Sequence, residues 1–144
     1  MLPTFRRFAR VRERLVPYLA NQARFAVARG LPLMRALCFE WPDDPHIWDV
    51  PYEYLLGDAL LVAPVVEPGI ETAEVYLPTG RWVDLWTGEA VAGGRSVTRA
   101  APLDVIPVFR RADAEELGAT SCATPTGRAA PSRFQPLPGP AAPR

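Results

Sequence analysis

Short runs of strand-forming residues, each closed by a turn signal, fill the middle of the chain and limit what it can fold into. Between Leu55 and Phe109 the apolar or alternating runs are separated by Gly and Pro residues. Short strands spaced by about 8–12 residues are typical of an antiparallel sandwich or barrel. The expected strands cover residues 60–66, 74–77, 81–87, 96–98 and 105–109.

Two of these strands carry residues that bear on their place in a sheet. Gly93-Gly94, directly before the strand over 96–98, is typical of a hairpin turn. Pro107 lies inside the strand over 105–109. Because proline cannot donate to a strand ladder, we expect this strand at an edge or at a bulge.

A helical period precedes the strands. Over residues 8–29 the apolar positions step by three and four, which predicts one stripe that faces a partner surface, while Arg10, Arg14 and Arg24 face away. Pro17 removes one helical hydrogen bond and should kink the helix near residues 13–15. Gly30 followed by Pro32 is a stop signal. The stripe consists of Phe8, Val11, Leu15, Tyr18, Gln22 and Phe25.

Two further segments flank this helix and these strands. Residues 33–40 are almost continuously apolar apart from Arg35, which predicts a buried strand in a sheet covered on both faces. Residues 112–144 are rich in Pro and Ala with small polar residues between them, and we expect them to be mostly disordered.

The charge balance argues against two classes of partner. Sixteen basic and sixteen acidic residues give a formal net charge of +0, so bulk electrostatics does not favour a nucleic acid or an anionic membrane. No run approaches the roughly 18 apolar residues of a membrane span. Cys38 and Cys122 make no disulfide framework, which favours a reduced, cytoplasmic setting.

One adjacent carboxylate pair lies in a predicted turn and is a candidate catalytic site. A retaining glycosidase needs two carboxylates about 5–5.5 Å apart across the bond it cleaves, and an inverting one roughly 6.5–9.5 Å. Asp43-Asp44 are neighbours in a turn between Pro42 and Pro45, and neighbours on such a turn usually point to different sides. Turn formation is therefore the favoured interpretation.

The other candidate side chains do not form a site either. His46 is the only histidine, close to Asp49, and a zinc site would need more nitrogen or sulfur ligands, so a surface loop is favoured. Ser96, Ser121 and Ser132 lie in no nucleophile-elbow pattern, and no glycine-rich phosphate loop is present. We therefore predict no catalytic residue, no metal ligand and no cofactor site in this chain.

Four aromatic residues leave two interpretations open. Trp82 and Trp86 alternate with Asp84 along one predicted strand face, and Tyr76 and Trp48 lie nearby in the sequence. Such a face suits a carbohydrate platform, but packing in a core or between domains is the commoner fate of large aromatics.

Eight blocks of sequence carry a resemblance. They are residues 14–19, 30–37, 39–44, 54–58, 60–65, 75–88, 102–103 and 106–109. In this order and at this spacing they resemble glycoside hydrolase family 31. Met-Arg-Ala at 34–36 and Trp-Pro-Asp-Asp at 41–44 look closest to the branch that holds α-glucosidases and α-xylosidases.

The resemblance implies an α+β, mainly β fold that covers only the C-terminal portion of such an enzyme. Residues 1–45 would be the end of a (β/α)8 catalytic barrel, 46–111 the proximal C-terminal β-sandwich domain, and 112–144 a disordered tail. The apolar stripe over 8–29 would pack on barrel strands. Both catalytic aspartates of the family lie upstream of every matching block, so none of them is carried over to this chain.

Three functional hypotheses follow. The first is a C-terminal fragment of a retaining α-glycosidase, inactive alone, whose parent hydrolyses α-glucosides or α-xylosides; the change of composition after Arg111 suggests a truncated or frame-shifted product. The second is a free-standing carbohydrate-binding or interaction sandwich that uses Trp82, Trp86 and Tyr76. The third is a piece that docks onto a separately encoded barrel, or associates with itself through the helix over 8–29.

Overall fold

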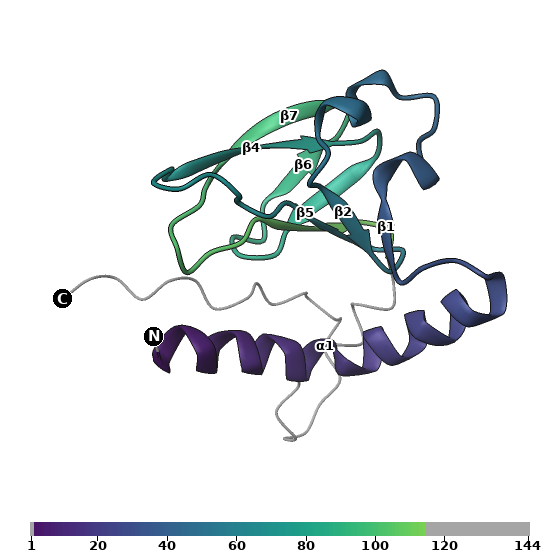
Figure 1. Ribbon diagram of the computed structural model, residues 1–144, viewed down its shortest axis with the longest axis horizontal. Coiled ribbons are helices and arrows are strands. Elements are labelled where there is room, and N and C mark those ends of the chain that lie inside the picture. Colours follow the sequence, from purple (N-terminus) through teal and green to yellow (C-terminus); the bar gives the residue numbers. More distant parts are fainter. Residues whose placement is uncertain (1, 115–144) are drawn as a thin grey trace.

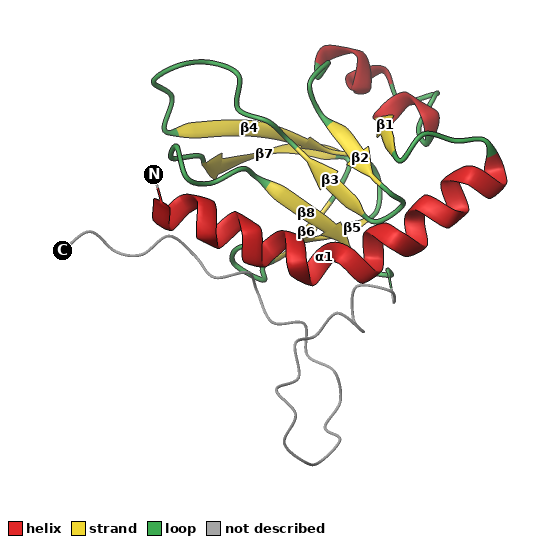
Figure 2. Cartoon of the chain, turned by 60° about the horizontal axis from the view of Figure 1, so that its bottom comes forward, coloured by secondary structure: helices red, strands yellow, loops and turns green. Residues whose placement is uncertain are grey.

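The computed structural model describes residues 2–114 and stacks them in three layers, two β-sheets and one long helix (Figures 1 and 2). The helix, α1, spans Leu2–Arg29. Two short 3-10 helices follow, η1 over Leu37–Phe39 and η2 over Pro45–Asp49. The strands are β1 Met34–Ala36, β2 Tyr54–Leu56, β3 Leu60–Val62, β4 Thr72–Leu77, β5 Arg81–Asp84, β6 Ala90–Ala92, β7 Arg95–Ala100 and β8 Val108–Arg111.

All strand pairs are antiparallel, which confirms the antiparallel β architecture. The larger sheet has six strands in the order β1-β2-β3-β8-β5-β6, and β4 and β7 form a second sheet of two strands. The two sheets face each other across an apolar core, as the layers of a β-sandwich do. The core residues are Leu37, Ile47, Leu55, Leu61, Ala63, Val75, Tyr76, Leu77, Trp82, Val91 and Phe109.

The centre of the six-stranded sheet is buried on both faces, because α1 covers the side away from the small sheet (Figure 2). Leu55, Leu61 and Phe109 lie opposite one another in the register and point into the core between the sheets. Their neighbour Leu60 points the other way, into a second apolar cluster with Tyr18 of the helix. This double coverage explains why β3 is apolar at every position.

The strand expected over 33–40 differs from this picture. Only Met34–Ala36 is a strand, and it is an edge strand whose side chains at 34 and 36 are exposed while Arg35 is buried. The prediction of a strand covered on both faces is therefore wrong for this segment. An apolar run without periodicity does not reveal which side is covered, and β3 has the doubly covered place instead.

The Gly93-Gly94 prediction is also wrong. These glycines join β6 to β7, but β6 pairs with β5 and β7 pairs with β4, so the turn carries the chain from one sheet to the other. Gly93 lies so close to Pro78 that a Cβ would be 1.9 Å from its carbonyl oxygen. A local turn signal gives the reversal but not the strand that the next segment pairs with.

Pro107 lies just before the last strand. β8 begins at Val108 and is central, between β3 and β5, so the expected edge strand or bulge is not found. The proline carbonyl accepts a hydrogen bond from the backbone N–H of Ala63 at 3.1 Å. Pro107 is therefore tolerated, because it lies one residue before the β8 hydrogen-bond ladder begins.

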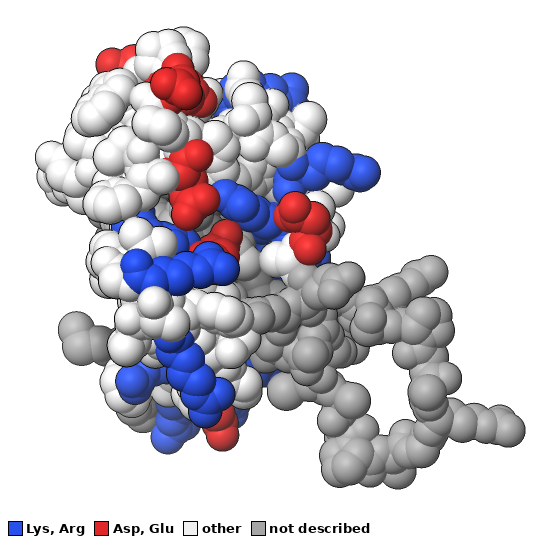
Figure 3. Space-filling view, turned by 90° about the vertical axis from the view of Figure 1, so that its right-hand side faces the viewer, with Lys and Arg blue, Asp and Glu red and all other residues white. Residues whose placement is uncertain are grey.

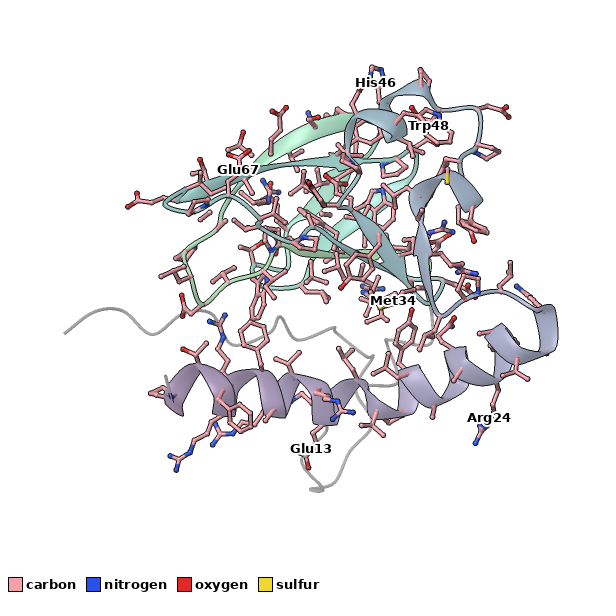
Figure 4. All side chains as sticks on the ribbon, in the orientation of Figure 1. Glu13, Arg24, Met34, His46, Trp48 and Glu67 are labelled. Carbon is pink, nitrogen blue, oxygen red and sulfur yellow. The ribbon has the colours of Figure 1, made fainter. Side chains whose placement is uncertain are left out.

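The helix begins earlier than predicted and packs on a different surface. Its stripe is buried or half-buried at Phe8, Val11, Leu15, Tyr18 and Gln22, against the chain's own six-stranded sheet rather than against barrel strands. Phe25, the last residue of the predicted stripe, is 39% exposed. Arg24 points away from the sheet (Figure 4), as expected. The helix bends near its middle (Figure 2), which agrees with the effect predicted for Pro17.

The domain boundaries and the tail stay predictions. β1, placed with the barrel end by the resemblance, is hydrogen-bonded to β2 of the sandwich sheet. The tail expected to be disordered lies, from residue 115 onward, outside the described residues. Within residues 2–114 no helix is long and apolar enough to cross a membrane.

Candidate functional site

Of the Asp43-Asp44 pair, Asp44 caps the 3-10 helix η2. Asp44 precedes η2, and its Oδ1 accepts a hydrogen bond from the backbone N–H of His46 at 3.1 Å. Its Oδ2 accepts a hydrogen bond from the hydroxyl of Tyr76 at 2.6 Å. Asp43 is exposed. The favoured interpretation of this segment as a turn is confirmed.

His46 lies on the outer surface of η2, where its side chain is exposed (Figure 4). Its ring centroid is 5.5 Å from that of Tyr76, with the two rings tilted at 42°. In the described part of the chain no group of three or more His, Cys, Asp or Glu side chains could hold a metal ion. Cys38 is a free, half-buried thiol, whereas Cys122, Ser121 and Ser132 lie outside the described residues.

Trp82 is part of the core and cannot stack on a sugar. Its side chain is 1% exposed, and its indole N–H donates to the carbonyl of Pro78 at 2.9 Å. Its ring centroid lies 6.1 Å from that of Trp41. Trp82 therefore takes no part in a carbohydrate platform, and for this residue the packing interpretation is confirmed.

Trp86 links the helix to the six-stranded sheet. It lies in the turn after β5, and its indole N–H donates to the carbonyl of Ile106 at 2.6 Å. The guanidinium of Arg7 sits 4.3 Å from the Trp86 ring centroid, and Phe8 meets the ring edge-on at 6.1 Å. Arg7 also pairs with Asp104 at 3.1 Å. These contacts fix the first half of α1.

A charged cluster that the sequence did not predict crosses the η1 side of the molecule. Figure 3 shows opposite charges side by side there, below a mostly uncharged upper part. The buried Arg35 donates to the carbonyl of Gly57 at 3.0 Å and pairs with the carboxylate of Asp58. Glu40 lies between Arg35, at 3.5 Å, and Arg111, at 3.8 Å. The cluster connects β1 to the β2–β3 turn. The one sequence signal for it was Arg35, the single charged residue near the middle of the apolar run over 33–40.

Glu53 is a buried carboxyl that sequence reasoning missed. It is 7% exposed, its Oε1 accepts a hydrogen bond from the backbone N–H of Tyr76 at 2.8 Å, and its Oε2 has no hydrogen-bond partner among the described residues. Burial raises the pKa of Glu53 to about 7, against the smaller opposing effect of the Tyr76 bond. Nothing in the sequence distinguishes it from the exposed acids around it.

Tyr76 contacts Asp44, His46 and Glu53. Its pKa is raised to about 12, first by burial and then by the hydrogen bond to Asp44 and the negative charge of that group. A group with that pKa stays a neutral phenol and acts as a fixed hydrogen-bond donor. Tyr76 therefore holds η2, through Asp44, onto the small sheet.

A groove of about 570 Å³ lies between η2 and the β4–β7 sheet. In a 3-10 helix residues three apart share one side, so His46 and Asp49 both face the groove while Ile47 enters the core. The groove is lined by His46, Asp49, Val50, Glu74, Tyr76, Gly94, Arg95 and Ser96.

The sequence matches one family over most of its described length. The model of the glycosyl hydrolase family 31 C-terminal domain matches residues 30–114. A 1,3-alpha-isomaltosidase from Kribbella flavida is 55% identical over 112 residues, which are 78% of this chain and 15% of that protein. A sulfoquinovosidase from Escherichia coli is 46% identical over 77% of this chain and 16% of its own length.

Solved structures agree with this match. A cycloalternan-degrading enzyme from Trueperella pyogenes, in complex with cycloalternan, superposes with a TM-score of 0.74 at 50% identity, over 76% of this chain and 15% of that enzyme. This chain thus spans about a sixth of the length of the relatives it matches. The chain belongs to glycosyl hydrolase family 31 and corresponds to the C-terminal domain of that family.

Proposed function

We propose that this chain is the C-terminal structural part of a family 31 retaining α-glycosidase and supports a catalytic barrel that residues 2–114 do not contain. The observation that carries the proposal is a second apolar face on α1. Phe5, Val16 and Val27 are 71%, 53% and 85% exposed. They are spaced by eleven residues, which is three turns of an α-helix, so they lie on one line.

A helix that is apolar on two faces belongs between two layers. The six-stranded sheet covers one face of α1, through Tyr18 and Gln22. The line through Phe5, Val16 and Val27 lies outside that cluster, and the exposed alanines at 9, 20 and 23 widen it, with Arg12 as the one charged residue on it. An exposed apolar strip of this length is typical of a protein–protein or interdomain contact.

The parent enzyme of this proposal hydrolyses α-linked glucosides or xylosides through a covalent glycosyl-enzyme intermediate. In the family both catalytic aspartates lie upstream of the segment present here. The chain alone is therefore proposed to be inactive, in a reduced, cytoplasmic setting where Cys38 stays a thiol.

The barrel is the proposed partner of the second α1 face, either in the same polypeptide or as a separate chain. A second copy of this chain, meeting the same face, is the competing occupant. Glycan binding through Trp82 and Trp86 is not favoured, because Trp82 is buried and the half-buried Trp86 contacts Arg7 and Phe8.

An assay of the isolated chain tests the inactivity. We expect no release of glucose or xylose from isomaltose, maltose or an α-xyloside above the rate without protein. Hydrolysis that persists through purification and co-elutes with the folded chain would overturn the proposal. A full-length family relative, assayed in parallel, is the positive control.

A further inference from the structure

The groove between η2 and the β4–β7 sheet has the dimensions of a small-ligand site. Its volume of about 570 Å³ lies within the range of about 300–1,000 Å³ that ligand clefts occupy. Its walls come from two elements far apart in the sequence, η2 with Val50 on one side and the paired strands β4 and β7 on the other.

The walls carry both hydrogen-bond donors and acceptors. Asp49 and Glu74 supply carboxylate oxygens, Arg95 supplies guanidinium N–H groups, and Ser96 supplies a hydroxyl that does both. Tyr76 and Ser96 are register partners, and Glu74 lies two residues along on the same strand face. Neighbouring sugar hydroxyls need this mixture, because each hydroxyl both donates and accepts.

The floor of the groove is fixed before any ligand arrives. Tyr76 is held through its hydroxyl by Asp44 at 2.6 Å and through its backbone N–H by Glu53 at 2.8 Å. The ring centroid of His46 lies 5.5 Å from that of Tyr76. A preorganised floor lowers the ordering cost of binding.

The charges in the groove select the class of ligand. The two carboxylates of Asp49 and Glu74 outnumber the one guanidinium of Arg95, so phosphate or sulfate is disfavoured. In the described residues no cluster could hold a metal ion. A neutral molecule rich in hydroxyl groups fits these conditions. We propose that this groove binds a neutral oligosaccharide, with Glu74, Arg95 and Ser96 as its polar contacts.

Titration of the full chain with sugars, followed by amide chemical shifts in NMR, tests the proposal. The probes are isomaltose, whose choice rests on the proposed function, together with maltose and cellobiose. We expect saturable shifts at residues 46–50, 74–76 and 94–96 with a dissociation constant in the millimolar range. The readout is binding by this chain alone, so it does not depend on whether the chain hydrolyses anything.

Variants separate a built site from weak surface contact. Arg95→Ala should weaken binding about tenfold, the loss expected for a charged hydrogen bond. Arg95 is exposed and its side chain bonds the carbonyl of Ala92 at 3.3 Å, so the fold should persist, which the dispersion of the spectrum checks. Ser96→Tyr, which fills the groove, should abolish binding, and Arg24→Ala on α1 should leave it unchanged.

Two results would overturn the site. One is the absence of saturable shifts with all three sugars on a well-dispersed spectrum of the parent chain. The other is equal affinity of the parent, Arg95→Ala and Ser96→Tyr, which would place any contact outside the groove.

Discussion

Glu53 shows at the scale of a single residue how burial decides chemistry that composition does not reveal. It directly precedes an apolar strand, and the chain brings its carboxyl under β4, where one oxygen meets the Tyr76 N–H and the other has no described partner. With a pKa of about 7 against an ordinary value of 4.5, the carboxyl stays protonated in the folded chain well above the pH at which the unfolded chain ionises it.

The sign of the pH dependence follows from this difference. Between about pH 4.5 and pH 7 the folded state binds more protons than the unfolded state, so the free energy of unfolding falls as the pH rises. Glu53→Gln keeps an acceptor for the Tyr76 N–H and removes the ionisation. We expect this variant to match the parent near pH 4.5 and to exceed it at pH 8 by up to about 3 kcal/mol.

Urea unfolding at several pH values measures this prediction. Glu67→Gln is the matched control, because Glu67 is exposed (Figure 4) and its replacement should leave the pH profile of the parent intact. Parallel profiles for the parent and Glu53→Gln would contradict the prediction, because they would show that Glu53 ionises at the same pH in the folded and the unfolded chain.

At the scale of elements, the contact between α1 and the β2–β3 turn organises the molecule. The hydroxyl of Tyr18 donates to the carbonyl of Leu56 at 2.7 Å and accepts from the N–H of Ala59 at 3.1 Å. One turn later Gln22 accepts from the N–H of Asp58 at 3.0 Å. Gly57 lies beneath both side chains, and its φ of +66° is left-handed backbone.

Gly57→Ala should therefore detach the helix. Its Cβ would lie 2.4 Å from the Tyr18 hydroxyl oxygen and 2.7 Å from Gln22 Cγ. Gly69→Ala is the control, because Gly69 has a similar φ of +78° but nothing within 4 Å of an added Cβ. We expect Gly69→Ala to cost about 1 kcal/mol of backbone strain, and Gly57→Ala roughly 2 kcal/mol more from overpacking and lost hydrogen bonds.

Amide hydrogen exchange shows where that energy is lost. Faster exchange in Gly57→Ala should centre on α1, whereas Gly69→Ala should leave α1 protected. Equal loss of stability in the two variants, with α1 protected in both, would mean that the helix does not depend on this turn.

The same scale shows what the sequence could predict. Alternation and turn residues located the helix and most strands, because these signals are local. The partner of each element was not predictable in this way: the stripe with Tyr18 packs on the chain's own sheet, and the Gly93-Gly94 turn changes sheets. Pairing depends on contacts between segments far apart in the chain, which a local pattern does not carry.

At the scale of the whole molecule, the family was recognisable from ordered sequence blocks and the groove was not. No sequence pattern shows that η2 lies beside the β4–β7 sheet. The two elements meet through the hydrogen bond between Tyr76 of β4 and Asp44, the cap of η2. The aromatic residues left two interpretations open in the sequence, and the favoured one, packing, holds for Trp82, which is among the most buried side chains. A large aromatic residue in a strand can pack in a core or lie on a binding surface, and only the burial seen in the structure distinguishes these two cases.

The whole-molecule account depends on the uncovered face of α1. Val16→Glu with Val27→Glu places two charges on that face, at exposed positions that should not disturb the chain's own fold. Val66→Glu adds a charge at an equally exposed valine, 55% against 53% for Val16, outside the helix. Thermal unfolding of the isolated variants should match that of the parent within a few degrees.

Reconstitution of a relative tests the central claim most directly. The Kribbella flavida 1,3-alpha-isomaltosidase, shortened by the segment that this chain matches, would be co-expressed with the chain or its variants, and its isomaltosidase activity measured. The account predicts no activity without the chain, restored activity with the parent chain or Val66→Glu, and at least tenfold less, about 1.4 kcal/mol, with the Val16→Glu, Val27→Glu chain. Full activity of the shortened enzyme by itself, or equal rescue by the doubly charged chain, would contradict it.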